Sequence, residues 1–145
     1  MSRTKCYLFL AALTFLISSC SSNQKVLTKT TLLNNQTFKL TEISTDSTYG
    51  LTEENPIKVG GITSSEGPLN EKRFLNALAG PNGEDISYKR LRSCCPFKTK
   101  NGFQGGGLLD EYELTYKGLK KPILIYINMY DHSNLKAPVG FTISE

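Results

Sequence analysis

The sequence has few of the side chains that most often build metal and catalytic sites. Its 145 residues include one histidine, four cysteines and no tryptophan. Without a second histidine or a Cys-x-x-Cys spacing, the chain lacks the ligand sets typical of zinc sites, so we predict no bound metal and no cofactor. The single histidine, His132, could act as a base for a cysteine thiol. Its polar neighbours (DHSN, residues 131–134) favour a surface loop instead.

Strong charge of one sign is also missing. The sequence contains 17 basic and 13 acidic residues, which gives a net charge of +4 at pH 7. A nucleic-acid-binding domain normally carries a dense basic patch, so we expect no nucleic-acid partner. A local excess of lysines favours either a solvated face or attraction to anionic lipid headgroups or cell-wall polymer. These lysines are Lys98, Lys100, Lys117, Lys120 and Lys121.

The sequence has no apolar run that is long enough to span a membrane. Residues 7–17 form an apolar run of eleven residues, whereas a membrane-spanning helix needs roughly 20. A basic segment precedes this run and small serines follow it, which is the pattern of a secretory signal. Residues 16–20 (LISSC) resemble the lipobox of bacterial lipoproteins, in which the cysteine is linked to diacylglycerol and becomes the first residue of the mature protein. The alternative is an ordinary secretory signal with an incidental cysteine.

The lipobox resemblance implies three segments. Residues 1–19 are a signal peptide, residues 20–35 are the lipidated Cys20 and a polar tether, and residues 36–145 are one globular domain of ordinary size. Since lipoproteins carry two or three acyl chains, the lipid would anchor the protein stably in a membrane of the bacterial envelope. Neither an aspartate nor an acidic run follows Cys20. By resemblance to other lipoproteins, this implies the outer membrane and the periplasmic side.

Alternation of apolar and polar residues predicts several strands, and one segment has helical periodicity. Residues 68–79 begin with proline, carry a narrow apolar stripe and end at a Gly-Pro pair, so we predict one helix there. Strands are predicted at residues 37–43, 56–59, 85–91, 108–116, 122–130 and 139–143; the fifth is apolar on both faces and hence central. This order predicts an α+β fold, with an antiparallel or mixed sheet of five to six strands and one helix packed on a face.

The most unusual feature of the sequence is the adjacent pair Cys94-Cys95. Cys6 falls in the predicted signal peptide and Cys20 is the predicted lipid site, so the pair has no distant cysteine partner in the domain. In an oxidising compartment the two thiols can bond to each other, stay free and buried, bond to another chain or bind a soft metal. A disulfide between neighbours tends to be reducible and functional, which makes Cys94 and Cys95 the candidate redox site.

Other motifs give weaker indications. Glycines at residues 105–107 precede a predicted strand rather than a helix, so they favour a flexible loop over a phosphate-binding loop. The carboxylates are scattered, and sequence alone does not pair them for hydrolysis. Tyrosines on the predicted strands could bind a sugar or peptide, although alternation along a strand would place half of them in the core. They are Tyr112, Tyr116, Tyr126 and Tyr130.

Several segments resemble an uncharacterised family of small Bacteroidetes lipoproteins. They are NPIKVGG at residues 55–61, GPLNE at 67–71, LNALAGPNG at 75–83, SCCPF at 93–97 and YINMY at 126–130, and the likeness covers residues 36–142. Some members of that family carry the label 2-dehydro-3-deoxyphosphooctonate aldolase. That enzyme is a (β/α)8 barrel of roughly 200 residues or more, which a domain of this length does not build. The resemblance therefore implies an envelope lipoprotein and brings no catalytic residues with it.

Two functions are consistent with these observations. The first is a non-enzymatic, lipid-anchored domain that binds an envelope protein or a cell-wall partner, or supports the envelope, because the sequence contains no recognisable catalytic set. The alternative is a thiol-dependent enzyme or redox-sensing domain that uses Cys94 and Cys95, with His132 as a weak candidate for the base. Exposure and reactivity of the two thiols distinguish these hypotheses.

Overall fold

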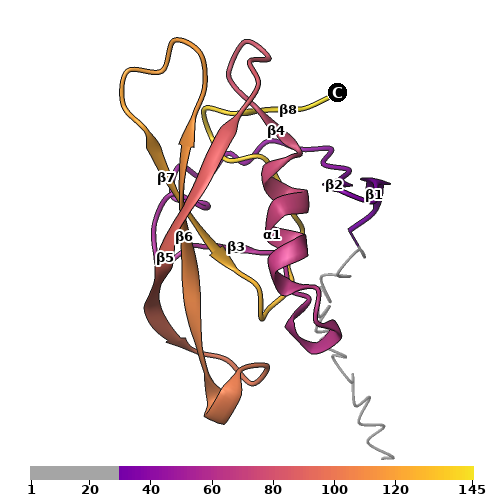
Figure 1. The fold of residues 1–145 in the computed structure, drawn as a ribbon, viewed down its shortest axis with the longest axis vertical. Coiled ribbons are helices and arrows are strands. Elements are labelled where there is room, and N and C mark those ends of the chain that lie inside the picture. Colours follow the sequence, from indigo (N-terminus) through magenta and orange to yellow (C-terminus); the bar gives the residue numbers. More distant parts are fainter. Residues whose placement is uncertain (1–29) are drawn as a thin grey trace, which may run out of the picture.

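The computed structural model describes residues 30–145 (Figure 1). The predicted signal peptide, the lipid site Cys20 and most of the predicted tether lie outside the described residues. Within residues 30–145, no helix is long and apolar enough to cross a membrane.

The main element is a four-stranded mixed sheet in the order β3-β7-β6-β5. Its strands are β3 (Ile57–Lys58), β7 (Ile123–Asn128), β6 (Gly106–Thr115) and β5 (Ser87–Lys98). β3 runs parallel to β7, and the other pairs are antiparallel. The prediction that the strand after Pro122 is central is confirmed, because β7 lies between β3 and β6.

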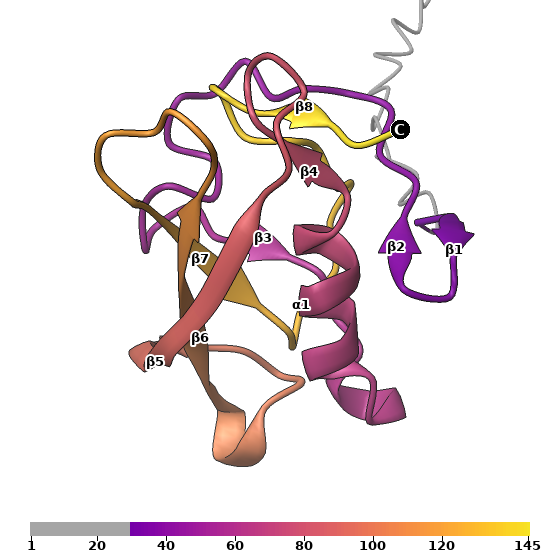
Figure 2. The ribbon, with the colours of Figure 1, turned by 45° about the horizontal axis from the view of Figure 1, so that its top comes forward.

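One helix, α1 (Gly67–Leu75), packs on one face of this sheet (Figure 2). Pro68 occupies the first turn, where its missing N–H leaves no bond unmade. Phe74 and Leu75 are fully buried and share one apolar cluster with Ile125 and Ile127 of β7. The predicted fold class, α+β with one helix on a sheet, is therefore confirmed.

The predicted helix was too long at its C-terminal end. Its last two residues form β4 (Leu78–Ala79), which pairs with β8 (Thr142–Ile143) near the end of the chain. The N–H of Ala77 bonds to the carbonyl of Phe74, which closes the last turn tightly. Leu78 and Ala79 are extended because they pair with residues more than sixty positions later in the chain. Helical periodicity within the segment carries no information about that pairing.

The strands also differ in length and grouping from the prediction. The main sheet has four strands rather than five or six, because the others form two-stranded sheets: β4 with β8, and β1 (Leu32–Asn34) with β2 (Thr37–Phe38). β1 lies inside the segment predicted as tether, and the Arg73 guanidinium donates to the carbonyl of Asn35 at 3.0 Å. Paired strand structure is therefore present at Leu32–Asn34, N-terminal to the predicted boundary at Gln36.

The strand predicted at residues 85–91 continues seven residues further, through the cysteine pair to Lys98. β5 and β6 consequently form one long hairpin, closed by the short 3-10 turn η2 (Phe103–Gly105). A second 3-10 turn, η1 (Ile62–Ser64), leads into α1. Figure 1 shows the β5–β6 hairpin reaching one end of the molecule and the β6–β7 connection reaching the other.

Candidate functional site

The cysteine pair is bonded within itself and lies at the open edge of the sheet. A disulfide joins Cys94 and Cys95, with the two sulfurs 2.12 Å apart. Within the part of the chain that the structure describes, β5 pairs with β6 alone, so its other edge carries unpaired backbone groups. Both cysteines are half-buried. Of the alternatives weighed from the sequence, the vicinal disulfide is the one observed.

Cys95 is the extra residue of a β-bulge. Cys94 pairs with Leu109 and Pro96 pairs with Leu108, which leaves Cys95 without a partner on β6. Its φ is +56°, in the left-handed region that a side chain with a Cβ rarely adopts. Pro96 also removes one donor from the strand, which suits an edge or bulge position. The sequence therefore combines the disulfide, the bulge and the proline at one point of β5.

Beyond the bulge, two aromatic rings and a glycine form the floor of the hairpin end. The rings of Phe97 and Tyr130 meet edge to face, with their centroids 5.8 Å apart. A Cβ on Gly107 would lie 2.9 Å from the Phe97 ring and 3.0 Å from the Tyr130 ring, so only glycine fits there without displacement. The close approach of this backbone to two rings fixes their position.

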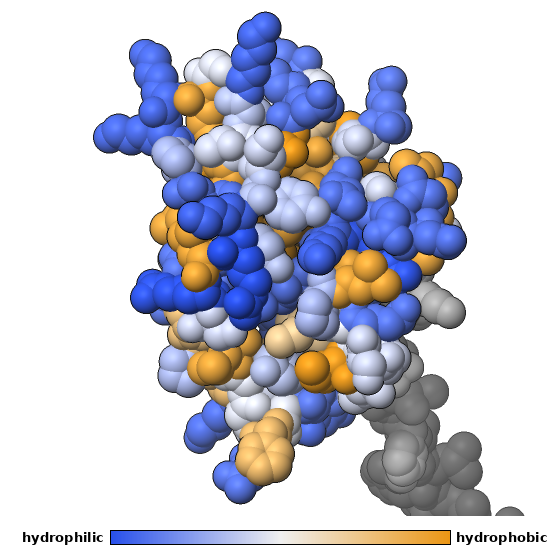
Figure 3. Space-filling view, viewed as in Figure 1, coloured by the Kyte–Doolittle hydropathy of each residue, from blue (hydrophilic) through white to orange (hydrophobic). Residues whose placement is uncertain are grey.

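An open apolar cavity of about 550 Å³ lies on this floor. We call its large apolar side chains the hairpin-end surface: Ile62, Pro96, Phe97, Phe103, Leu108 and Tyr130. Phe103 stands at the tip with 86% of its surface exposed, more than any other large apolar side chain of the described residues. The space-filling view shows an isolated apolar group projecting from this end of the molecule, among hydrophilic side chains (Figure 3).

The tip is held by one carboxylate. Asp131 accepts hydrogen bonds from the Thr99 hydroxyl at 2.7 Å, the Asn101 amide at 2.9 Å and the Asn128 amide at 3.0 Å. Burial alone would raise the pKa of Asp131, but these donors hold it below its usual value. The hairpin tip is thus tied to the end of β7 by an ionised, well-satisfied group, which keeps Phe103 in a defined place.

His132 lies far from the cysteine pair. It is exposed and pairs with Val59 beside β3, and its ring covers Gly60 so closely that a Cβ there would lie 2.0 Å from the ring. The bridge to Val59 places His132 beside β3, and β7 and β6 lie between β3 and β5 in the sheet. The structure therefore does not bring His132 and the Cys94-Cys95 pair together, and a cysteine–histidine dyad does not form here.

The strongest electrostatic perturbation lies in a buried cluster that the sequence did not reveal. Glu71 of α1 is 0% exposed, and the Tyr112 hydroxyl of β6 donates to its Oε2 at 2.8 Å. Its Oε1 has no hydrogen-bond partner. Burial and the nearby negative charge of Asp110 raise the pKa of Glu71 to about 8. Burial, followed by the charge of Glu71, raises the pKa of Tyr112 far above its usual value.

Asp110 connects this cluster to β5. The Arg90 guanidinium holds it in a two-point ion pair with both distances at 2.7 Å, and the Ser93 hydroxyl donates to it at 2.8 Å. Ser93 directly precedes the disulfide. None of the carboxylates in this cluster lines a cavity described above, so we assign the cluster to fold stability rather than to chemistry on a ligand.

The tyrosines and lysines singled out in the sequence do not gather into single surfaces. Tyr112 faces α1, while Tyr126 lies on the opposite sheet face, where its hydroxyl approaches Glu111 at 3.4 Å. Tyr116 packs on Phe141, and Tyr130 belongs to the hairpin-end surface. The lysines before and after β6 are separated by the ten residues of that strand, about 33 Å.

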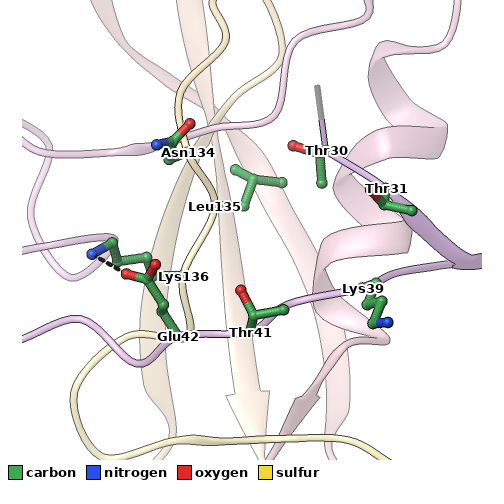
Figure 4. A pocket seen from close by; sticks show the side chains of 8 residues that line it. All are labelled: Thr30, Thr31, Lys39, Thr41, Glu42, Asn134, Leu135 and Lys136. Atoms are coloured by element: carbon green, nitrogen blue, oxygen red, sulfur yellow. Dashed lines mark ion pairs between the residues drawn. The ribbon is translucent and has the colours of Figure 1, made fainter. Parts of the chain in front are cut away.

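A second, polar groove of about 370 Å³ lies between the N-terminal segment and residues 134–136 (Figure 4). Thr30, Thr31 and Thr41 contribute hydroxyls to it, and Glu42 and Lys136 form an ion pair at its rim, 2.5 Å apart. Its lining holds neither an aromatic platform nor a buried charge, so it offers a ligand fewer anchoring groups than the hairpin end.

Residues 30–145 contain no cluster of three or more His, Cys, Asp or Glu side chains that could hold a metal ion. The site that the structure assembles is therefore the hairpin-end surface, with the Cys94-Cys95 disulfide at its base. The sequence indicated the cysteines and the glycines, but not that Phe103, Tyr130 and Ile62 would meet beside them. Comparison with known proteins found no matching protein-family model, no similar curated protein and no similar solved structure.

Proposed function

We propose that this protein is a lipid-anchored domain of the bacterial envelope that binds a protein partner through the hairpin-end surface. The observation that carries the proposal is Phe103, a large aromatic side chain that is 86% exposed at the tip of a hairpin held in place by Asp131. Such a side chain adds almost nothing to the core, while its ring can bury apolar area against a partner. Because the tip is already ordered, little conformational entropy is lost on binding.

Charge on the hairpin indicates the chemistry of the partner. Lys98 and Lys100 flank the tip and are exposed, and the neighbouring carboxylate of Asp131 is engaged by three donors. An apolar centre with a basic rim suits a partner that presents an apolar recess bordered by carboxylates. Anchoring at Cys20 in the envelope rests on the lipobox resemblance of residues 16–20.

Binding is a better account than catalysis for this arrangement. The groups with strongly raised pKa values, Glu71 and Tyr112, are buried in the packing between α1 and the sheet and line neither the hairpin-end cavity nor the polar groove. The only histidine lies across the sheet from the cysteine pair. A reactive site needs such groups beside a substrate-sized space, and here the cavity at the hairpin end is lined mainly by apolar side chains.

Site-specific photo-crosslinking in intact cells tests the proposal. A photoreactive phenylalanine analogue replaces Phe103 in the full-length chain, and the control carries it at Leu124, which is 39% exposed on the sheet face away from α1. We expect one protein to be labelled from position 103 and not from position 124. Labelling of lipid or of cell-wall glycan from position 103, or equal labelling from both positions, would overturn the proposal of a protein partner.

Affinity measurements on the labelled protein then separate specific binding from contact by chance. Phe103→Ser should weaken binding to the purified partner by about tenfold to a hundredfold, because burying a phenylalanine contributes roughly 1.5–3 kcal/mol. Lys98→Glu together with Lys100→Glu should weaken it most at low salt. Unchanged affinity in both variants would show that the hairpin end is not the binding surface.

A further inference from the structure

The disulfide between Cys94 and Cys95 is poorly placed to stabilise the fold. A disulfide stabilises mainly by removing conformations from the unfolded chain, and this effect grows with the length of the loop that it closes. Here the bonded residues are sequence neighbours, one position apart. The bond therefore excludes very few unfolded conformations and joins no two elements of the fold. A role other than global stability has to account for it.

What the bond does hold is the local shape of β5. It links Cys94, which is still in register with Leu109, to the bulged Cys95 with its φ of +56°. A residue with a Cβ normally avoids this region at a cost of about 1 kcal/mol or more. Without the bond, nothing covalent maintains the left-handed conformation, so Cys95 can relax toward an extended one.

The position of the pair also makes it accessible. β5 has no strand on its outer edge within the described residues, and Ser93 and Pro96 on either side of the pair are exposed. Two basic side chains that precede the pair on β5, Arg90 and Arg92, are held by Asp110 and Glu111. A second protein can therefore approach the sulfurs from the open side of the sheet without displacing another element.

We propose that Cys94-Cys95 is a thiol–disulfide exchange site that accepts two electrons from a dithiol protein of the envelope and thereby reshapes the hairpin end. A thiolate of the donor attacks one of the two sulfurs, the bond between Cys94 and Cys95 breaks, and the released cysteine leaves as a thiolate that takes up a proton. The second donor thiol then attacks the mixed disulfide. The donor is left with a disulfide and this chain with two thiols. The exchange reaction does not depend on the binding function proposed above.

Reduction should act locally, because the bulge directly precedes the hairpin-end surface. Phe97 follows it by two residues and packs on Tyr130 and over Gly107. When Cys95 leaves the left-handed conformation, the register between Pro96 and Leu108 is no longer imposed. The aromatic floor then loses its fixed geometry, while α1 and the buried cluster of Glu71 keep theirs.

The first experiment uses the full-length protein, purified in detergent without reductant. Treatment with dithiothreitol in the absence of denaturant should raise the mass by about 2 Da and allow alkylation of two thiols on the peptide that contains Cys94 and Cys95. A thioredoxin-type protein that lacks its second cysteine should be trapped as a mixed disulfide on the same peptide, with Cys94→Ser plus Cys95→Ser as the unreactive control. Thiols that are free before reduction, or a bond that opens only after denaturation, would overturn the proposal.

Hydrogen exchange then tests the conformational part. Reduction should speed exchange of the amides from Cys94 to Leu108 by about tenfold or more and leave α1 unchanged. Two variants without the bond provide matched controls: Cys94→Ser with Cys95→Gly keeps a residue suited to a positive φ, and Cys94→Ser with Cys95→Ala does not. The alanine variant should exchange like the reduced protein, and the glycine variant more slowly. Unfolding of the whole domain on reduction, or equal exchange in all forms, would refute the local switch.

Discussion

Replacing Glu71 by glutamine should make the protein more stable at alkaline pH, although the side chain is completely buried. Glu71 accepts a hydrogen bond from Tyr112, and its other oxygen lacks a hydrogen-bond partner. The ionised form is disfavoured by burial and by the charge of Asp110, and of the charges around it only Arg90 favours it. Glutamine keeps an oxygen for the Tyr112 hydroxyl and carries no charge, so it resembles the protonated acid.

The size of the effect follows from the two pKa values. The pKa of Glu71 rises from 4.5 to about 8 on folding. Between these values the folded protein holds a proton that the unfolded chain releases, so stability falls as pH rises. At about 1.36 kcal/mol per pH unit, an interval of about 3.5 units corresponds to about 5 kcal/mol. The stabilisation is complete below pH 4.5, declines through the interval and is lost above pH 8, whereas Glu71→Gln lacks this dependence.

Guanidinium denaturation followed by circular dichroism between pH 5 and pH 9 measures the difference. The free energy of unfolding of Glu71→Gln relative to the native sequence should increase steadily toward alkaline pH and level off above pH 8. Comparing the two proteins at each pH cancels the pH dependence that they share, and Glu54→Gln serves as a control for the loss of one exposed carboxylate. A difference that does not change with pH, or that favours the native sequence at pH 9, would refute the argument.

Three further predictions concern the hairpin end and the anchor. Gly107→Ala should lower the free energy of unfolding by about 1–3 kcal/mol, because its Cβ would press on the Phe97 ring. Thermal denaturation checks this, with Gly106→Ala as the control, since its Cβ would meet no atom closer than 3.8 Å. Phe103→Ser should change stability by less than about 0.5 kcal/mol in the same assay, given its exposure. Cys20→Ser should abolish incorporation of labelled fatty acid into the protein, and continued acylation of this variant would contradict lipid anchoring at Cys20.

Local sequence signals predicted the elements whose partners are close along the chain. Alternation correctly placed β6 and β7, and Pro68 correctly placed the start of α1. The prediction failed where pairing with a distant segment decides the conformation: Leu78 and Ala79 continue a helical pattern but pair with β8. It also stopped β5 too early, because a bulge at each of two positions interrupts the alternation from which a strand is recognised.

The candidate site was only partly visible in the sequence for the same reason. Adjacent cysteines are conspicuous in any sequence. Their half-buried position on an edge strand follows once the pairing register of β5 is known. The buried cluster joins Glu71 of α1 to Tyr112 and Asp110 of β6, which lie about forty residues away. A glutamate in the first turns of a helix is expected to be a solvated charge, and only tertiary packing turns it inward.

The two ends of β5 explain why a redox change at the bulge should stay local. On the N-terminal side, Arg90 and Ser93 are bonded to Asp110, which lies against the buried Glu71 cluster. On the C-terminal side, Phe97 packs on Tyr130, and Asp131 ties the tip to β7. Only Cys94, Cys95 and Pro96 lie between these anchors. Relaxation of the bulge can shift the contacts on its C-terminal side. To spread toward the N-terminal side, it would have to break the charged network around Asp110. Asp110 is buried, and separating it from Arg90 and Ser93 would leave its charge unpaired, which is strongly destabilising. The apolar contacts should therefore yield first. The hairpin-end surface is therefore the part of the molecule that reports the state of the disulfide.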